Sequence, residues 1–276
     1  MRPTFLVNAA SYKSPAEGPV GEAEREKMMA VNAILPQMIA RVCLMTKTPW
    51  GHVSSGSVFR GAKMVENGRP IVCGRLGEPE TLKLFEAKPE RFHGFAEMDE
   101  PNFSFRNPAC DFYSGTKALA EEAIKDIGQS YLWRLSLPFS ERQETCNWLW
   151  QMQRRGEIQE SIHSFSHLED CVRACLDLWE MRAPFGIYNV TNPAAMTTGH
   201  VAEAMRRVLR MAVRVKPGGD EPAQPGCILD SGKLARAGLK LRPAGEAFED
   251  CLGHLRVSAR GLRSISVAGI FPAATL

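Results

Sequence analysis

The stretch DFYSGTKALAEEAIKDI, Asp111 to Ile127, decides how the rest of the chain is interpreted. Its alanine, leucine and glutamate content and its helically spaced apolar residues predict a helix. Tyr113 and Lys117 are four residues apart, so a helix places both side chains on one face. An ammonium group beside a phenol lowers the tyrosine pKa from its usual value of about 10. The pair predicts a tyrosine that transfers protons at neutral pH, but the spacing alone also fits an exposed lysine beside a half-buried tyrosine.

Strand and helix patterns alternate on both sides of this stretch. A long amphipathic helix is predicted over residues 22–47, and Pro36 should kink it or restart it after Asn32. Residues 60–105 contain several prolines and predict an irregular excursion that partly covers a pocket. The alternation predicts an α/β fold with a parallel sheet and helices on its faces. Short buried strands are predicted over residues 4–10, 51–59 and 131–139.

The pattern changes after Pro138, where the helices and strands become shorter and less regular. A polar loop is expected around His163 and His167, and residues 256–276 show no clear periodicity. Helices are predicted over residues 141–155, 168–181, 198–211 and 245–255, strands over 186–191 and 212–216, and a turn with a short helix over 229–237.

Composition narrows the class of protein. The chain has 276 residues, of which 44% are hydrophobic, which suffices for one large domain or a domain with a smaller lobe. A net charge of +3 demands neither nucleic acid nor an anionic membrane as partner. The eight cysteines include no Cys-x-x-Cys pair, which fits reduced thiols. The apolar runs look too short to cross a bilayer and the first residues lack the long apolar region of a signal peptide, so we expect a cytoplasmic protein.

Other polar residues are weaker candidates for a site. His163 and His167 are four apart, but no third metal ligand is evident, and Cys171 and Cys175 fit a helix core better than a metal site. We therefore expect no metal. Arg134 on its predicted strand fits a substrate phosphate or a buried carboxylate equally well.

Eight segments, in the same order, resemble the extended short-chain dehydrogenase/reductase superfamily. Within it, the chain is similar to the branch of dTDP-4-dehydrorhamnose reductases and the related plant epimerase/reductases. The matching segments are VNAAS (7–11), VNAILP (31–36), HVSSGSVF (52–59), EPNFSF (100–105), DFYSGTKALAEE (111–122), WRLSLP (133–138), YNVTNP (188–193) and LDSGKL (229–234).

The resemblance implies a role for each catalytic candidate. Tyr113 would be the general acid, and Lys117 would hold the tyrosine pKa down and hydrogen-bond the nicotinamide ribose. Ser55 would hydrogen-bond the reacting oxygen, with Ser54 as its rival on the opposite side of the strand.

The resemblance also implies cofactor contacts. Asn8, Ala9 and Ala10 would form the strand end beneath the cofactor, and Asn32 would back the site. The expected cofactor is NADP or NAD, and the sequence does not select between them.

The chain departs from the family in one respect. A dinucleotide site of this type uses a Gly-x-Gly-x-x-Gly turn before a helix, and none occurs in this sequence. By analogy, about 60 residues comprising two β-α units and a strand would precede residue 1. We therefore expect an N-terminally truncated Rossmann-like sheet whose binding of NADP or NAD alone is doubtful. Its uncovered apolar edge would invite a homodimer or another partner.

The expected domains are a partial Rossmann-like catalytic domain at 1–140, a smaller substrate-binding lobe at 141–256 and an unassigned tail at 257–276. The implied reaction is NAD(P)H-dependent reduction of the 4-keto group of a nucleotide-linked deoxysugar, inactive if the cofactor-binding part is missing. One alternative is a non-catalytic subunit like the regulatory subunit of methionine adenosyltransferase. Another is an NAD-dependent sugar-nucleotide epimerase or dehydratase with the same triad.

Overall fold

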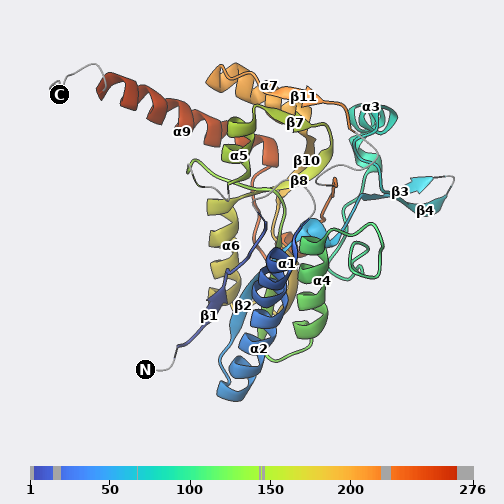
Figure 1. Ribbon diagram of the computed structural model, residues 1–276, viewed down its shortest axis with the longest axis vertical. Helices are drawn as coiled ribbons and strands as arrows, with labels where there is room; N and C mark the ends of the chain where they lie inside the picture. The colour runs from blue at the N-terminus through green and yellow to red at the C-terminus, as the bar shows by residue number, and fades with distance from the viewer. Residues whose placement is uncertain are drawn as a thin grey trace.

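The central sheet of the protein is parallel and has four strands in the order β1-β2-β5-β9 (Figure 1). The computed structural model describes residues 3–14, 20–66, 68–142, 144, 147–218 and 225–265, with side chains up to residue 255. The sheet confirms the predicted α/β class. Its strands are β1 (Leu6–Asn8), β2 (Trp50–Ser55), β5 (Ser130–Leu135) and β9 (Gly186–Asn189).

Helices cover both faces of this sheet. Successive side chains of β5 point to opposite faces, and each face has an apolar cluster on which helices pack. Leu132 packs with residues of α2 and α4 on one face. Tyr131 and Trp133 point to the other face and pack with α6 and α8. The bounds of these helices are α2 (Leu35–Thr46), α4 (Phe112–Ile124), α6 (Leu168–Glu180) and α8 (Gly232–Arg236).

The helical stretch before β2 is interrupted as predicted. It consists of α1 (Glu22–Met28), a π-helical segment η1 (Met29–Ile34) and α2, with Pro36 in the first turn of α2. By length and composition the whole stretch Glu22–Thr46 could cross a membrane, which corrects the expectation of short apolar runs. This is weak support for a span, because a core helix of a soluble protein passes the same test.

The excursion after β2 is more regular than expected. It contains a short 3₁₀ turn η2 (Gly56–Val58), an antiparallel hairpin of β3 (Ala62–Glu66) and β4 (Arg69–Cys73), helix α3 (Pro79–Ala87) and a 3₁₀ turn η3 (Pro89–Arg91). Backbone hydrogen bonds tie it to a distant segment, from Gly61 N to Gly226 O and from Phe95 N to Ile228 O. Because these bonds join segments that are far apart in the sequence, local sequence patterns did not predict the regular structure of this excursion.

A second sheet forms beyond β5, with the order β10-β8-β6. The prediction of a polar loop at residues 163–167 was wrong, because this segment is the completely buried strand β8. Its companions are β6 (Pro138–Phe139), β8 (Ile162–His167) and β10 (Asn192–Thr197), with a separate parallel pair β7 (Glu157–Gln159) and β11 (Arg214–Lys216).

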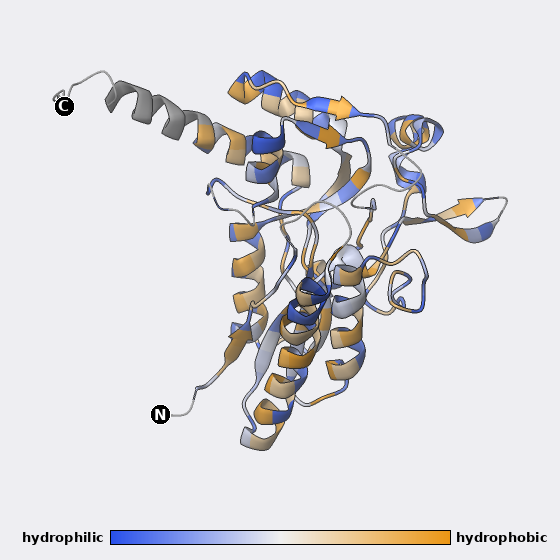
Figure 2. Cartoon of the chain, viewed as in Figure 1, coloured by the Kyte–Doolittle hydropathy of each residue, from blue (hydrophilic) through white to orange (hydrophobic). Residues whose placement is uncertain are grey.

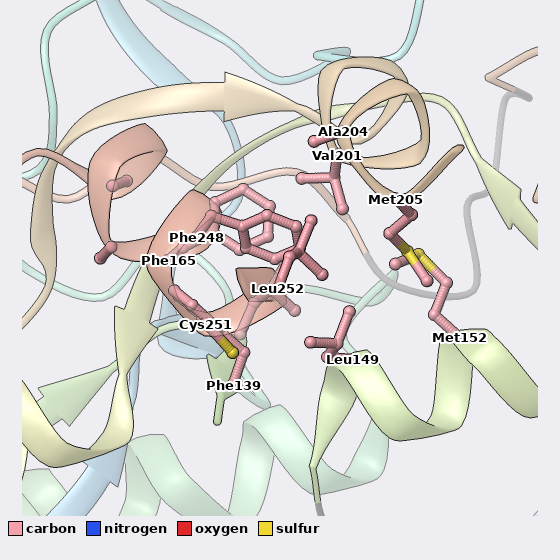
Figure 3. Close-up of a cluster of buried hydrophobic side chains, with 13 residues drawn as sticks. Phe139, Leu149, Met152, Phe165, Val201, Ala204, Met205, Phe248, Cys251 and Leu252 are labelled. Atoms are coloured by element: carbon pink, nitrogen blue, oxygen red, sulfur yellow. The ribbon is translucent and has the colours of Figure 1, made fainter. Parts of the chain in front are cut away.

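Three helices pack with this second sheet around a separate apolar core (Figure 3). The expected helix at 141–155 starts only at Trp148, and residues 143, 145 and 146 lie outside the described residues. The last helix extends to Ile265, ten residues beyond the prediction, and residues 266–276 are also outside the description. The helices are α5 (Trp148–Arg155), α7 (Thr198–Leu209) and α9 (Ala244–Ile265).

The outer edge of β1 and the outer face of α2 are open within the described part of the chain. No described strand pairs with the free side of β1, where Val7 is 47% exposed. Apolar residues are also exposed along the helix before β2, which appears orange over much of its length in Figure 2. They include Ile34, Met38, Val42 and Met45, the last 75% exposed.

Candidate active site

Tyr113 lies in the first turn of α4, which is fixed by an N-terminal cap. The Asp111 carboxylate accepts hydrogen bonds from Ser114 N at 2.9 Å and from Ser114 Oγ at 2.6 Å. Such a cap satisfies a backbone N–H that has no partner within the helix. Because α4 packs on η2, directly after β2, the cap holds Tyr113 at the carboxyl end of that strand.

Ser55 and Ser54 face opposite ways, as strand geometry requires. The Ser55 hydroxyl accepts a hydrogen bond from Ser57 N at 3.2 Å and also hydrogen-bonds the Tyr113 side chain. The buried Ser54 hydroxyl instead donates to Glu121 Oε1 at 2.5 Å. The structure therefore brings Ser55, rather than Ser54, to the tyrosine.

Lys117 is buried beneath Tyr113. Its Nζ lies 6.0 Å from the centroid of the Tyr113 ring and donates a hydrogen bond to Val53 O at 3.3 Å. Burial lowers the pKa of Lys117 to about 8, while the Glu121 carboxylate acts in the opposite direction. Within the described residues this one bond leaves two of the three ammonium hydrogens for another partner, which fits a ribose hydroxyl.

The pKa of Tyr113 differs from the sequence prediction. Burial raises it above its ordinary value, and hydrogen bonds from Ser11 and Ser55 only partly oppose this effect. Burial has the largest effect on this pKa, so the predicted lowering was wrong. The phenol is therefore protonated at neutral pH and can act as an acid.

Two further residues meet Tyr113 and were given no role from the sequence. The Ser11 hydroxyl hydrogen-bonds the tyrosine, and Lys13 Nζ lies 5.5 Å from its ring centroid. Ser11 ends the VNAAS segment, so its position directly after β1 was the available signal. Lys13 lies in no comparable motif. Its position near the Tyr113 ring depends on the path of the loop after β1, which the sequence did not predict.

Asn32 fixes that loop from inside the molecule. Its side-chain oxygen accepts a hydrogen bond from Tyr12 N, and its amide donates to Tyr12 O, both at 2.8 Å. The amide also donates to Thr116 Oγ1 on α4 at 3.2 Å. Asn32 lies in the π-helical segment, a distortion that is frequent at functional sites. It thus backs the site by joining the loop to α4.

The end of β1 contains the other expected cofactor contacts. Asn8 is buried, its amide nitrogen lies 3.1 Å from His52 Nδ1, and its oxygen accepts a hydrogen bond from Ala10 N. Burial lowers the pKa of His52 to about 3, so this histidine is neutral. Ala9 and Ala10 are exposed, which leaves their backbone accessible to a ligand above the sheet.

Arg134, which the sequence left open, pairs with a buried carboxylate. Its Nη2 lies 2.7 Å from Glu121 Oε2, and its Nε donates to both carboxylate oxygens at 3.0 and 3.1 Å. Both side chains are at most 3% exposed, so the arginine is unavailable to a substrate phosphate.

The remaining candidates lie elsewhere. His163 is buried in β8, where burial lowers its pKa to about 4, and it is not joined with His167 in a metal-like cluster of described residues. Cys171 and Cys175 lie in the apolar cluster under α6, as expected.

Comparison with known proteins places these observations in a family. The family described as "RmlD substrate binding domain" matches residues 1–226. A bifunctional dTDP-4-dehydrorhamnose 3,5-epimerase/dTDP-4-dehydrorhamnose reductase of Arabidopsis thaliana is 29% identical over 207 residues, covering 75% of this chain and 60% of the relative. The trifunctional UDP-glucose 4,6-dehydratase/UDP-4-keto-6-deoxy-D-glucose 3,5-epimerase/UDP-4-keto-L-rhamnose-reductase RHM2 of the same plant is 21% identical over 210 residues, covering 76% of this chain and 27% of the relative. The chain thus spans at most about 60% of these two relatives.

Solved structures agree on the fold. A dTDP-4-dehydrorhamnose reductase from Bacillus anthracis in complex with NADP superimposes with a TM-score of 0.65 at 20% identity, covering 93% of this chain and 81% of that one. A dTDP-4-dehydrorhamnose reductase from Clostridium acetobutylicum gives a TM-score of 0.66 at 17% identity, with coverage of 92% and 81%. Because the family match covers most of the chain, we conclude that this protein belongs to the RmlD substrate-binding domain family.

Proposed function

We propose that the chain is the catalytic part of a reductase that converts the 4-keto group of a nucleotide-linked 6-deoxysugar to a hydroxyl group. The observation that carries this proposal is the meeting of Tyr113, Ser55 and Lys117 at the carboxyl end of β2. Ligands of open parallel sheets bind at this end. Its relatives in the family include named dTDP-4-dehydrorhamnose reductases.

The residues divide the chemistry among them. The protonated Tyr113 gives its proton to the ketone oxygen, and the Ser55 hydroxyl hydrogen-bonds that oxygen as negative charge develops. The buried Lys117 ammonium stabilises the phenolate that remains and holds the nicotinamide ribose. When bound, NADPH or NADH supplies the hydride that adds to the carbonyl carbon.

The residues present fit one end of the dinucleotide cofactor better than its middle. Lys117 and the strand end at Asn8 suit the nicotinamide ribose, but no Gly-x-Gly-x-x-Gly turn is present for the pyrophosphate. This favours a second candidate, a non-catalytic binding or regulatory subunit with the same fold. That role gives no reason for Tyr113, Ser55 and Ser11 to be joined by hydrogen bonds.

Three assignments complete the proposal. Residues 1–140 form the catalytic unit, residues 141–256 form the lobe that binds the sugar nucleotide, and the protein acts in the cytoplasm. A second copy of the chain covers the exposed stripe of α2, since Met38, Val42 and Met45 recur at helical spacing and can pack against themselves about a two-fold axis. Light scattering should then give a dimer, whereas a monomer at micromolar concentration contradicts this assignment.

The test is turnover with dTDP-4-dehydrorhamnose, followed by the loss of nicotinamide absorbance. Wild-type protein should oxidise NADPH or NADH only when the sugar is present. Tyr113→Phe should lower kcat by about 10²- to 10⁴-fold, the usual contribution of a positioned acid. Tyr12→Phe is a matched control, because that hydroxyl binds Glu24 instead. Undiminished turnover by Tyr113→Phe would refute the proposed role.

A further inference from the structure

A mixed cluster of metal-binding side chains lies in the second sheet region, away from Tyr113. Glu141 follows β6, His167 ends β8 and Cys251 lies on α9. One donor atom from each of these residues lies within 4.8 Å of the other two. The three segments are far apart in the sequence, so the fold alone brings the donors together.

The contact between Glu141 and His167 is a long hydrogen bond, and its length also matches the separation of two ligands of one ion. Glu141 Oε1 lies 3.3 Å from His167 Nε2 and 3.5 Å from His254 Nδ1. Hydrogen bonds between charged groups are usually about 2.7–2.9 Å long. Ligand atoms about 2.0–2.2 Å from a tetrahedral zinc ion lie about 3.3–3.6 Å apart. The nitrogen and oxygen atoms are therefore spaced as they would be around one ion.

The surroundings of His167 prepare its Nε2 as a ligand. Asp170 Oδ1 lies 3.2 Å from Nδ1, and the Arg242 Nη2 donor lies 3.4 Å from the same nitrogen. When an ion takes the place of the hydrogen bond between Nε2 and Glu141, Asp170 can accept the hydrogen of Nδ1, so that the lone pair of Nε2 faces the ion. A carboxylate behind the imidazole is the usual support of a zinc-bound histidine. Without an ion, Nε2 donates a hydrogen bond to Glu141 Oε1 and Nδ1 accepts one from Arg242 Nη2.

Cys251 and His254 supply the remaining positions from α9. They are three residues apart, so both lie on one face of the helix. Cys251 is fully buried among the apolar residues of Figure 3, and burial, with a smaller effect of Glu141, raises its thiol pKa. His254 is 73% exposed and contacts only Glu141 of the cluster, so it would have to turn toward Cys251 and His167 to complete the set. Packing accounts for a buried thiol, but not for a carboxylate and two imidazoles gathered beside it.

We propose that Glu141, His167, Cys251 and His254 form a zinc site that fastens α9 to the ends of β6 and β8. One thiolate, one carboxylate and two neutral imidazoles balance the charge of Zn²⁺, so the occupied site places no net charge beside the apolar core around Cys251. The thiol proton leaves to solvent when the metal binds. With four protein ligands the site is structural, and it does not depend on the proposed reductase activity.

Cobalt(II) titration of the chelator-treated protein tests this site directly. Wild-type protein should bind one equivalent and show both a thiolate-to-cobalt charge-transfer band and the strong visible bands of tetrahedral cobalt, which one equivalent of zinc should abolish. Cys251→Ser should lose the charge-transfer band. Cys43→Ser, which removes a buried thiol on α2, should keep it. A wild-type protein that binds no cobalt, or an unchanged band in Cys251→Ser, would overturn the proposal.

Two further measurements use no thiol substitution. Asp170→Asn should weaken zinc binding by about 10- to 100-fold, the usual effect of removing a histidine's supporting carboxylate. Zinc should also raise the urea midpoint of wild-type protein but not that of Glu141→Gln. Equal zinc affinity in Asp170→Asn and wild type, or equal stabilisation of wild type and Glu141→Gln, would count against the site.

Discussion

Replacing Glu121 with glutamine should strongly destabilise the protein, because it removes the only negative charge paired with Arg134 in the described core. The pair is buried, with side chains 1% and 3% exposed, and three contacts of 2.7–3.1 Å join them. Breaking a buried ion pair on one side costs about 3–5 kcal/mol, since the remaining charge stays buried. Glutamine keeps one acceptor oxygen, so we expect about 3 kcal/mol.

The loss should be measured as the free energy of unfolding in urea, followed by tryptophan fluorescence. Trp133 is buried beside Arg134 in β5 and reports on this region. Glu122→Gln is the matched control, because that carboxylate pairs with Arg106 at the surface and should contribute about 1 kcal/mol or less. The double variant Glu121→Leu, Arg134→Met should recover most of the stability. A cost below about 1 kcal/mol for Glu121→Gln would refute the reasoning.

The remaining predictions concern Lys117 and two glycines. Burial depresses the Lys117 pKa from 10.5 to about 8. Between these pH values the unfolded chain therefore binds more protons than the folded chain. The free-energy cost of burying the charged lysine accordingly disappears as pH rises through this range. Lys117→Met should therefore be more stable than wild type at pH 7, with an advantage that shrinks between about pH 8 and 10.5 in urea melts; a constant difference would contradict this. Gly51→Ala should cost at least about 1–3 kcal/mol, because its Cβ would lie 2.0 Å from the buried Trp133 ring. Gly115→Ala meets the Phe105 ring instead, which is 46% exposed and can turn away, so its thermal midpoint should change little.

The positions of the candidate catalytic residues relative to one another could be predicted because their relation is local. A four-residue helical spacing places Tyr113 and Lys117 together, and strand alternation separates Ser55 from Ser54. The kink near Asn32 followed from Pro36 in the same way. The interpretation of Arg134 stayed open, because its partner Glu121 is on another element.

The missed features depend on contacts between distant segments. Strand β8 looked like a polar loop, yet Ser164 Oγ accepts from Leu229 N and Ser166 Oγ donates to Val190 O, so its polar groups are satisfied inside the protein. The pKa of Tyr113 depends on burial, which no spacing encodes. The sequence predicted no metal at His167, because a third ligand beside His163 was not evident, whereas the fold places Glu141 and Cys251 beside it.

The most direct test of the reductase proposal is a fluorescence titration of the purified chain with NADPH and NADH. The nicotinamide end of the cofactor should lie against Lys117 at the carboxyl end of β2. Wild-type protein should bind at least one of the two saturably, and Lys117→Met should bind it more weakly. A folded chain that binds neither nucleotide would contradict a reductase site in this chain, as expected for the binding-subunit alternative or for a chain that lacks the cofactor-binding part.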